Sequence, residues 1–121
     1  MSNLKLPNMS AKSLRKLVKD DGQYYKIAYA TKAMVTSDRV SITHHDNLIA
    51  VLRDEYIFIS NCGYDTRTTA NRLNAIVSAY NPRYRVGITN YSMVIRDTDN
   101  GTETPIHSGG MFINRNGTIS R

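Results

Sequence analysis

The residues best suited to chemistry lie between Gly63 and Arg72, where a glycine is followed by three threonines and two arginines. A glycine turn that leads into a helix presents unpaired backbone N–H groups and a partial positive charge, which suits an anion. We therefore predict an anion or nucleic-acid site built from Thr66, Arg67, Thr68, Thr69 and Arg72. The alternative is that the threonines only cap the helix and that Tyr64 packs into the core.

A second candidate is the strand around Tyr84, which Arg83 and Arg85 flank. An arginine–aromatic–arginine strand can grip a nucleic-acid backbone while the ring stacks on a base. Alternation along the strand favours another arrangement, in which the arginines line the outer face over a buried Tyr84.

A metal site is the third candidate, because His44, His45 and Asp46 are adjacent and Cys62 and His107 could add ligands. Adjacent histidines on a strand point to opposite faces, and no paired Cys or His spacing accompanies them. Cys62 would need an activating base to act as a nucleophile. The sequence also has no P-loop, dinucleotide fingerprint, GxSxG or HExxH motif. We therefore predict no metal, no cofactor and no catalytic residue, and we favour a protein that is not an enzyme.

Basic residues are unevenly distributed along the 121 residues, whose net charge is +6. Residues 1–35 carry seven basic and two acidic side chains, and residues 61–96 carry five basic and one acidic. Two basic blocks favour a basic patch that binds polyanions such as nucleic acid, although a solvated surface would look the same. The first helix contributes a secondary basic patch formed by Lys12, Arg15, Lys16 and Lys19.

Two helices must position these groups. Ser10 is a suitable cap for a helix from Ala11 to about Lys19, with Leu14, Leu17 and Val18 on its buried side. The second helix runs from about Thr69 to Tyr80 and stops before Pro82, with an apolar stripe at helical spacing. That stripe consists of Leu73, Ile76, Val77 and Tyr80.

Most of the remaining chain alternates with the period of strands. One strand is expected from Tyr24 toward Thr36, and three short strands form a meander. Strand alternation returns after the second helix, from Arg83 to Arg96, with a bulge or a turn near Asn90 where the apolar phase changes. Hairpin and edge-strand signals come last, at 99–101, 105–106, 111–113 and 116–117. The meander strands are 40–43, 48–52 and 56–60. We predict an α+β fold: an antiparallel sheet of about five or six strands, the 69–80 helix packed on it and a short N-terminal helix. Residues 1–9 are expected to form a flexible arm and residues 10–121 a single domain.

The segment 56–74 resembles a family of small bacteriophage proteins. The shared signature is Gly, Trp or Tyr, x, Thr, x, Thr, Thr, x, x, Arg, an aliphatic residue and Asn, which this chain matches from Gly63 to Asn74. A late Gly-Met-aromatic-Ile segment, here 110–113, accompanies it, and the resemblance covers residues 42–114. The family usually has Trp where this chain has Tyr64. The resemblance implies a phage origin and a shared strand–turn–helix core, and it transfers no catalytic residue.

Three functions follow from these observations. The first is a non-enzymatic phage accessory protein that binds nucleic acid or another phosphate-bearing partner through a basic face. The second is a host-takeover or anti-defence protein that binds a host protein or sequesters a nucleotide signal, and the third is a virion or assembly component. A single cysteine, Cys62, and the lack of a signal peptide predict the host cytoplasm. The apolar runs are too short to cross a membrane.

Overall fold

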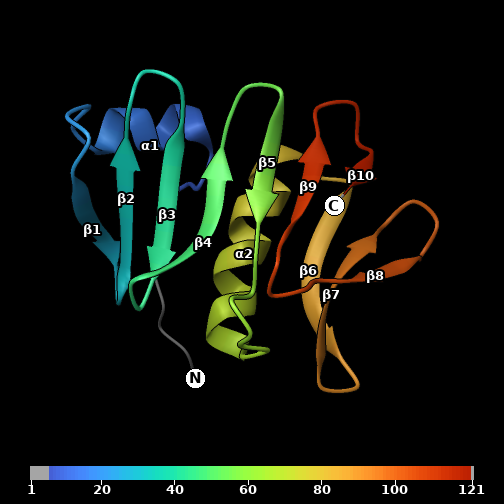
Figure 1. The fold of residues 1–121 in the computed structure, drawn as a ribbon. Helices are drawn as coiled ribbons and strands as arrows, with labels where there is room; N and C mark the ends of the chain where they lie inside the picture. Colours follow the sequence, from blue (N-terminus) through green and yellow to red (C-terminus); the bar gives the residue numbers. More distant parts are fainter. Residues whose placement is uncertain (1–5, 121) are drawn as a thin grey trace.

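Two antiparallel sheets and two helices make up residues 6–120, which are the residues that the computed structural model describes (Figure 1). The larger sheet has seven strands, in the spatial order β1 (Tyr24–Ala28), β2 (Thr31–Val35), β3 (Val40–His44), β4 (Asn47–Leu52), β5 (Tyr56–Ile59), β9 (Met111–Asn114) and β10 (Ile119–Ser120). The smaller sheet consists of β6 (Tyr84–Thr89), β7 (Ser92–Asp97) and β8 (Glu103–Pro105). The helices are α1 (Ala11–Leu17) and α2 (Arg67–Tyr80).

The α+β class and the antiparallel pairing are confirmed, whereas the predicted single sheet of five or six strands is wrong in number. Strands β1 to β5 pair in chain order, but β5 then pairs with β9, and the chain between them forms α2 and the smaller sheet. Alternation shows that a segment is a strand without showing which strand it pairs with, so the second sheet was not foreseen. The segment 111–113 was expected at an edge, yet β9 lies between β5 and β10.

The first helix begins as predicted and ends earlier. The Ser10 side chain accepts a hydrogen bond from the Ser13 backbone N–H at 3.2 Å, which is the expected N-cap. Leu14 and Val18 are buried, but Leu17 is 58% exposed. Because α1 has only about two turns, its contact with the sheet accommodates Leu14 and Val18 and leaves the expected third member of the stripe in solvent.

The second helix starts at Arg67, two residues before its predicted start, because Thr66 caps it. The Thr66 hydroxyl accepts a hydrogen bond from the Thr69 backbone N–H at 3.3 Å. The helix ends before Asn81 and Pro82, as predicted. In the view of Figure 1 both helices lie behind the larger sheet, and α2 starts at the end of the sheet opposite to α1.

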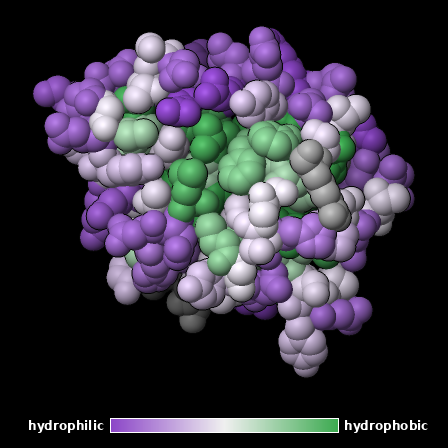
Figure 2. All heavy atoms as spheres, viewed as in Figure 1, coloured by the Kyte–Doolittle hydropathy of each residue, from purple (hydrophilic) through white to green (hydrophobic). Residues whose placement is uncertain are grey.

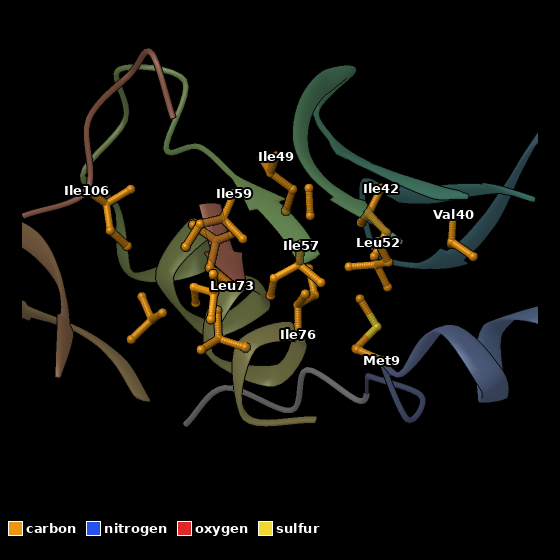
Figure 3. Close-up of a cluster of buried hydrophobic side chains, with 14 of the residues drawn as sticks. Met9, Val40, Ile42, Ile49, Leu52, Ile57, Ile59, Leu73, Ile76 and Ile106 are labelled. Atoms are coloured by element: carbon orange, nitrogen blue, oxygen red, sulfur yellow. The ribbon is translucent and has the colours of Figure 1, made fainter. Parts of the chain in front are cut away.

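The main core lies between the larger sheet and α2 (Figure 3). Leu73 and Ile76 of α2 face Ile57 and Ile59 of β5, and all four are at most 1% exposed. Met9 is also buried, at 1% exposure. The arm predicted for residues 1–9 therefore ends in a core residue, while residues 1–5 lie outside the described part of the chain. The packed region thus includes Met9 just ahead of the Ser10 cap.

Two turns divide segments that the sequence shows as nearly continuous. The strand expected from Tyr24 toward Thr36 is a hairpin, and Ala30 at its turn has φ of +50°. Of the bulge or turn expected near Asn90, the structure shows a turn: Asn90 and Tyr91 both have positive φ, as a two-residue turn between twisted strands requires. Alternation hid the first turn because Tyr29 and Ala30 are not typical turn residues.

The outer face of the larger sheet has an apolar row across neighbouring strands. Val51 pairs with Phe58, which pairs with Phe112, and all three are partly buried. The Phe58 and Phe112 ring centroids are 5.4 Å apart, and Tyr56 meets Phe112 edge-on at 5.3 Å. Figure 2 shows apolar side chains gathered over this middle part of the sheet. Cross-strand ring contacts of this kind stabilise the β5–β9 pairing that closes the fold.

Candidate anion-binding site

A pocket of about 400 Å³ lies where three segments meet at the start of α2. The first segment is the β3–β4 turn, the second is the loop that follows β5, and the third is the first turn of α2. The lining residues are His44, His45, Asn47, Ile49, Asn61, Cys62, Tyr64, Thr66, Thr68 and Thr69. The predicted threonines therefore share a pocket with residues 19 to 25 positions earlier in the chain.

Local backbone geometry forms the first two walls. His45 and Asp46 have φ of +49° and +63°, which makes a tight two-residue turn and brings both histidines to the pocket. The expectation that the adjacent histidines face opposite sides is wrong, because His45 belongs to the turn and not to the strand. In the second wall, Cys62 and Gly63 also have positive φ, and the buried Asn61 side chain accepts a hydrogen bond from the Gly63 N–H at 2.8 Å.

The third wall supplies hydrogen-bond donors. Thr66 uses its hydroxyl and its carbonyl to accept from the backbone N–H groups of Thr69 and Ala70. The N–H groups of Arg67 and Thr68 have no partner within residues 6–120, as expected for the first turn of a helix. The hydroxyls of Thr66 and Thr68 lie 3.3 Å apart. The helix start therefore offers free N–H groups together with hydroxyls beside the pocket.

Arg72 lies behind this wall and is 1% exposed. Its guanidinium donates to the Thr31 hydroxyl at 2.5 Å, to the Thr68 carbonyl at 2.8 Å and to the Tyr29 carbonyl at 2.7 Å. All three acceptors are neutral, and no carboxylate of residues 6–120 forms an ion pair with it. Burial lowers the pKa of Arg72, but an arginine stays charged. The pocket is thus adjacent to a buried positive charge without a counter-charge.

His44 is the most buried ring of the pocket, at 4% exposure, and its Nδ1 has no hydrogen-bond partner among the described residues. Burial lowers the pKa of His44 to about 4, assisted by the charges of Arg72 and His45 and opposed by the Ala30 carbonyl. His44 is therefore neutral at pH 7, with one ring nitrogen that can donate and one that can accept.

The lowered pKa of His44 makes the stability of the fold depend on pH. In the unfolded chain the ring binds a proton near pH 6.5, whereas the folded protein excludes that proton until about pH 4. Stability is therefore fully present above pH 6.5 and falls as the pH drops toward 4. For this group alone we expect a loss of about 2.5 kcal/mol in the free energy of unfolding between pH 7.5 and 4.5.

Urea denaturation across this pH range, comparing the wild type with His44→Gln, measures the effect. The variant should lack this part of the pH dependence, and the exposed neighbour His45→Gln should retain it. An identical pH dependence in the wild type and His44→Gln would contradict the assignment.

Aromatic rings from two separate segments of the chain line the pocket. His45 stacks in a tilted arrangement on His44, with ring centroids 4.4 Å apart, and its ring meets Tyr29 edge-on at 6.2 Å. Tyr64 comes from the loop after β5 and is 53% exposed. The expectation that Tyr64 packs into the core is wrong, because the loop turns at Gly63 and carries the ring away from the sheet.

The side chains of the other predicted basic residues do not line this pocket. Arg67 is exposed and is not among its lining residues. Arg83 and Arg85 follow the far end of α2, which spans about 20 Å. The α1 patch, formed by Lys12, Arg15, Lys16 and Lys19, is at the opposite end of the larger sheet in Figure 1. Apart from Arg67, these basic residues therefore lie away from the pocket.

Most arginines of the second basic block are engaged within the protein. Arg83 donates two hydrogen bonds to the Asp97 carboxylate, at 2.9 and 2.7 Å, which raises the pKa of Arg83 and lowers that of Asp97. Arg96 pairs with Glu103 at 2.6 Å. Arg85 stays exposed while donating to the Pro82 and Tyr84 carbonyls. Tyr84 is buried between them, so the outward arginines over a buried tyrosine are confirmed.

From the sequence, His44, His45 and Cys62 were candidates for a metal site, and Cys62 also for a nucleophile. Their shared pocket was not predicted. Among residues 6–120, no three His, Cys, Asp or Glu side chains gather closely enough to hold a metal ion. The Cys62 thiol instead donates to the Leu48 carbonyl at 3.1 Å. Two turns could have indicated the pocket: His45-Asp46 just before β4 and Cys62-Gly63 just after β5. Because β4 and β5 pair as an antiparallel hairpin, these two turns lie at the same end of the sheet.

Comparison with known proteins identifies the family. The family model described as Kyanoviridae Gp96 protein matches residues 6–118, nearly the whole chain, so the chain belongs to this family of phage proteins. The predicted phage origin is thereby supported. No curated protein and no solved structure matches the chain. In the described part, neither helix is long and apolar enough to cross a membrane.

Proposed function

We propose that this Kyanoviridae Gp96 family protein is a non-enzymatic phage accessory protein that binds a phosphate-bearing ligand in the pocket at the start of α2. The observation that carries the proposal is the buried Arg72 charge, which has three neutral acceptors and, among residues 6–120, no carboxylate partner. Buried charges are normally paired, because taking an unpaired ion out of water is costly. A bound anion would supply the missing negative charge.

The pocket wall supports an anion more than a cation. The partial positive charge of a helix start adds to the Arg72 charge, and the free N–H groups of Arg67 and Thr68 can donate to phosphate oxygens. The nearby carboxylates are already engaged: Asp46 pairs with Lys32 at 3.4 Å, and Asp65 accepts from the Asn61 side chain at 2.9 Å. Arg72 itself would act through its field, since it is buried behind Thr68 and does not line the pocket.

Inorganic phosphate titrated into ¹⁵N-labelled protein tests this proposal by NMR. We expect saturable shifts of the backbone amides of Arg67, Thr68 and Thr69. Thr68→Glu should weaken phosphate binding by at least about tenfold, because it places a carboxylate where the anion binds. The same substitution should not destabilise α2, since acidic side chains in a first turn are favourable.

Ser37→Glu is the matched control, because it changes the charge equally in the exposed β2–β3 turn, and its phosphate affinity should equal that of the wild type. Phosphate shifts that leave the α2 start untouched, or that persist unchanged in Thr68→Glu, would overturn the proposal.

A polynucleotide bound along a basic face is the rival function, and salt separates it from the pocket. One phosphate in a pocket predicts a shallow dependence of affinity on salt, with a slope of about −1, whereas a polyanion track that neutralises several phosphates predicts a steep one. Fluorescence anisotropy with a single-stranded oligonucleotide measures this slope. A steep slope, reduced by Arg85→Glu and unaffected by Thr68→Glu, would favour the track. A nuclease-resistant partner recovered from host lysate would favour a host-protein target instead.

A further inference from the structure

We infer that the ligand of this pocket is a single nucleotide, whose phosphate lies at the start of α2 and whose base stacks on Tyr64. This inference rests on the proposed function and adds the class of ligand. It starts from the size of the pocket, about 400 Å³, which falls in the range of small-molecule and cofactor sites. A bare phosphate would contact the helix start and leave most of that space, including both ring-bearing walls, without a partner.

The aromatic side chains give that space its chemistry. Tyr64 is half exposed at the pocket, and His45 brings a second ring from a separate segment. The His45 ring also contacts the rings of His44 and Tyr29, and these contacts favour its position at the pocket. Aromatic side chains next to a phosphate site are the arrangement in which proteins stack nucleobases, because every base has a flat π-face.

His44 provides an independent observation that points to a ligand. Its ring is almost fully buried, lines the pocket and has an Nδ1 without a partner in residues 6–120. Buried polar atoms of folded proteins are nearly always hydrogen-bonded, so an unpartnered nitrogen on a pocket-lining ring is consistent with a contact to a ligand. A neutral imidazole suits an uncharged donor or acceptor such as a ribose hydroxyl or a base edge, whereas the helix start suits the phosphate.

Asn47 completes the set of polar groups. Its side chain lines the pocket and, within residues 6–120, makes only a long hydrogen bond, 3.4 Å, to the His45 carbonyl. A side-chain amide that is held this weakly can turn to pair with the edge of a base. By contrast, the Asn61 amide is fully engaged by Gly63, Asp65 and Ile106, so it serves the loop and not the ligand.

Isothermal titration calorimetry with inorganic phosphate and with the four ribonucleoside 5′-monophosphates tests the inference. We expect at least one nucleotide to bind about tenfold or more tightly than phosphate, as one stacked base would provide. Tyr64→Ala should reduce that nucleotide's affinity to within about threefold of the phosphate value, while Tyr64→Phe should retain the preference. Phosphate affinity should be equal in all three proteins.

Tyr24→Ala is the control, because Tyr24 is similarly exposed, at 43%, but lies on the edge strand β1 away from the pocket. Four nucleotides that bind no more tightly than phosphate would overturn the inference, and so would a Tyr64→Ala variant that loses phosphate and nucleotide equally. After either of these two outcomes, the proposed function would still stand if the wild type binds phosphate and Thr68→Glu does not. If the wild type binds neither phosphate nor any nucleotide, the proposed function and this inference are both wrong.

Discussion

Arg72→Ala is expected to lower the free energy of unfolding by about 3–5 kcal/mol, the largest effect of a single substitution that we predict. The side chain connects α2 to the β1–β2 turn through the Tyr29 carbonyl and the Thr31 hydroxyl. Truncation would remove all three hydrogen bonds, leave the Tyr29 carbonyl with only the Thr31 hydroxyl as donor within residues 6–120, and open a cavity in a buried site.

Urea denaturation followed by circular dichroism measures this loss, with two companion variants to separate its causes. Arg72→Lys keeps the charge, but one ammonium group cannot reach three acceptors in the same geometry, so most of the loss should remain. Arg72→Met fills much of the space that Arg72→Ala leaves empty, so it should be more stable than Arg72→Ala. Its phosphate affinity should still be lower than that of the wild type, because the positive charge is gone.

Arg67→Ala is the control on the same helix, because Arg67 is exposed and makes no ion pair among the described residues. Its stability should stay within about 0.5 kcal/mol of the wild type. An Arg72→Ala protein as stable as Arg67→Ala would show that the three hydrogen bonds contribute nothing to the fold.

Gly110→Ala is expected to cost about 3–4 kcal/mol, because two effects combine at this position. Gly110 has φ of +83°, a conformation that side chains rarely adopt. A Cβ atom there would also overlap the Phe58 ring and lie 2.9 Å from the Ile59 carbonyl oxygen. The ring cannot move freely, since it packs on Phe112 in the β5–β9 pairing.

Gly109→Ala is a matched control on the adjacent residue. A Cβ at position 109 meets nothing within 4 Å, and the backbone there has an ordinary φ. Thermal unfolding should therefore show a Tm near that of the wild type for Gly109→Ala and a decrease of about 6–24 °C for Gly110→Ala, given about 2–6 °C per kcal/mol for a domain of this size. Equal Tm values for the two variants would contradict the close approach of Gly110 to Phe58.

The resemblance signature can now be connected to physical roles in the fold. Gly63 turns the loop with φ of +84°, and Thr66 caps α2. Arg72 connects α2 to the β1–β2 turn, and Asn74 accepts a hydrogen bond from the Val86 backbone N–H at 2.9 Å, which attaches the smaller sheet to the helix. Four residues of the signature thus have positions that the fold requires. The ligand-facing role of Tyr64 remains a prediction.

The sequence by itself determined the local elements. Apolar period predicted α2 and its stop before Pro82, with the start two residues late, and alternation predicted the meander β3–β5. A change in the phase of the alternation predicted a bulge or a turn near Asn90, where the β6–β7 turn lies. These features depend on φ/ψ preferences and hydrogen bonds within a few residues, so neighbouring residue types are sufficient to specify them.

The tertiary structure alone decided the partners of those elements. Nothing local shows that β9 pairs with β5 across some 50 residues, or that β6–β8 form their own sheet. The burial of Arg72 and the pocket with His44 also depend on chain segments that are distant in sequence. The physical reason is that strand pairing and side-chain burial depend on which surfaces remain uncovered after the elements form. The spacing of residues along the chain does not specify those surfaces.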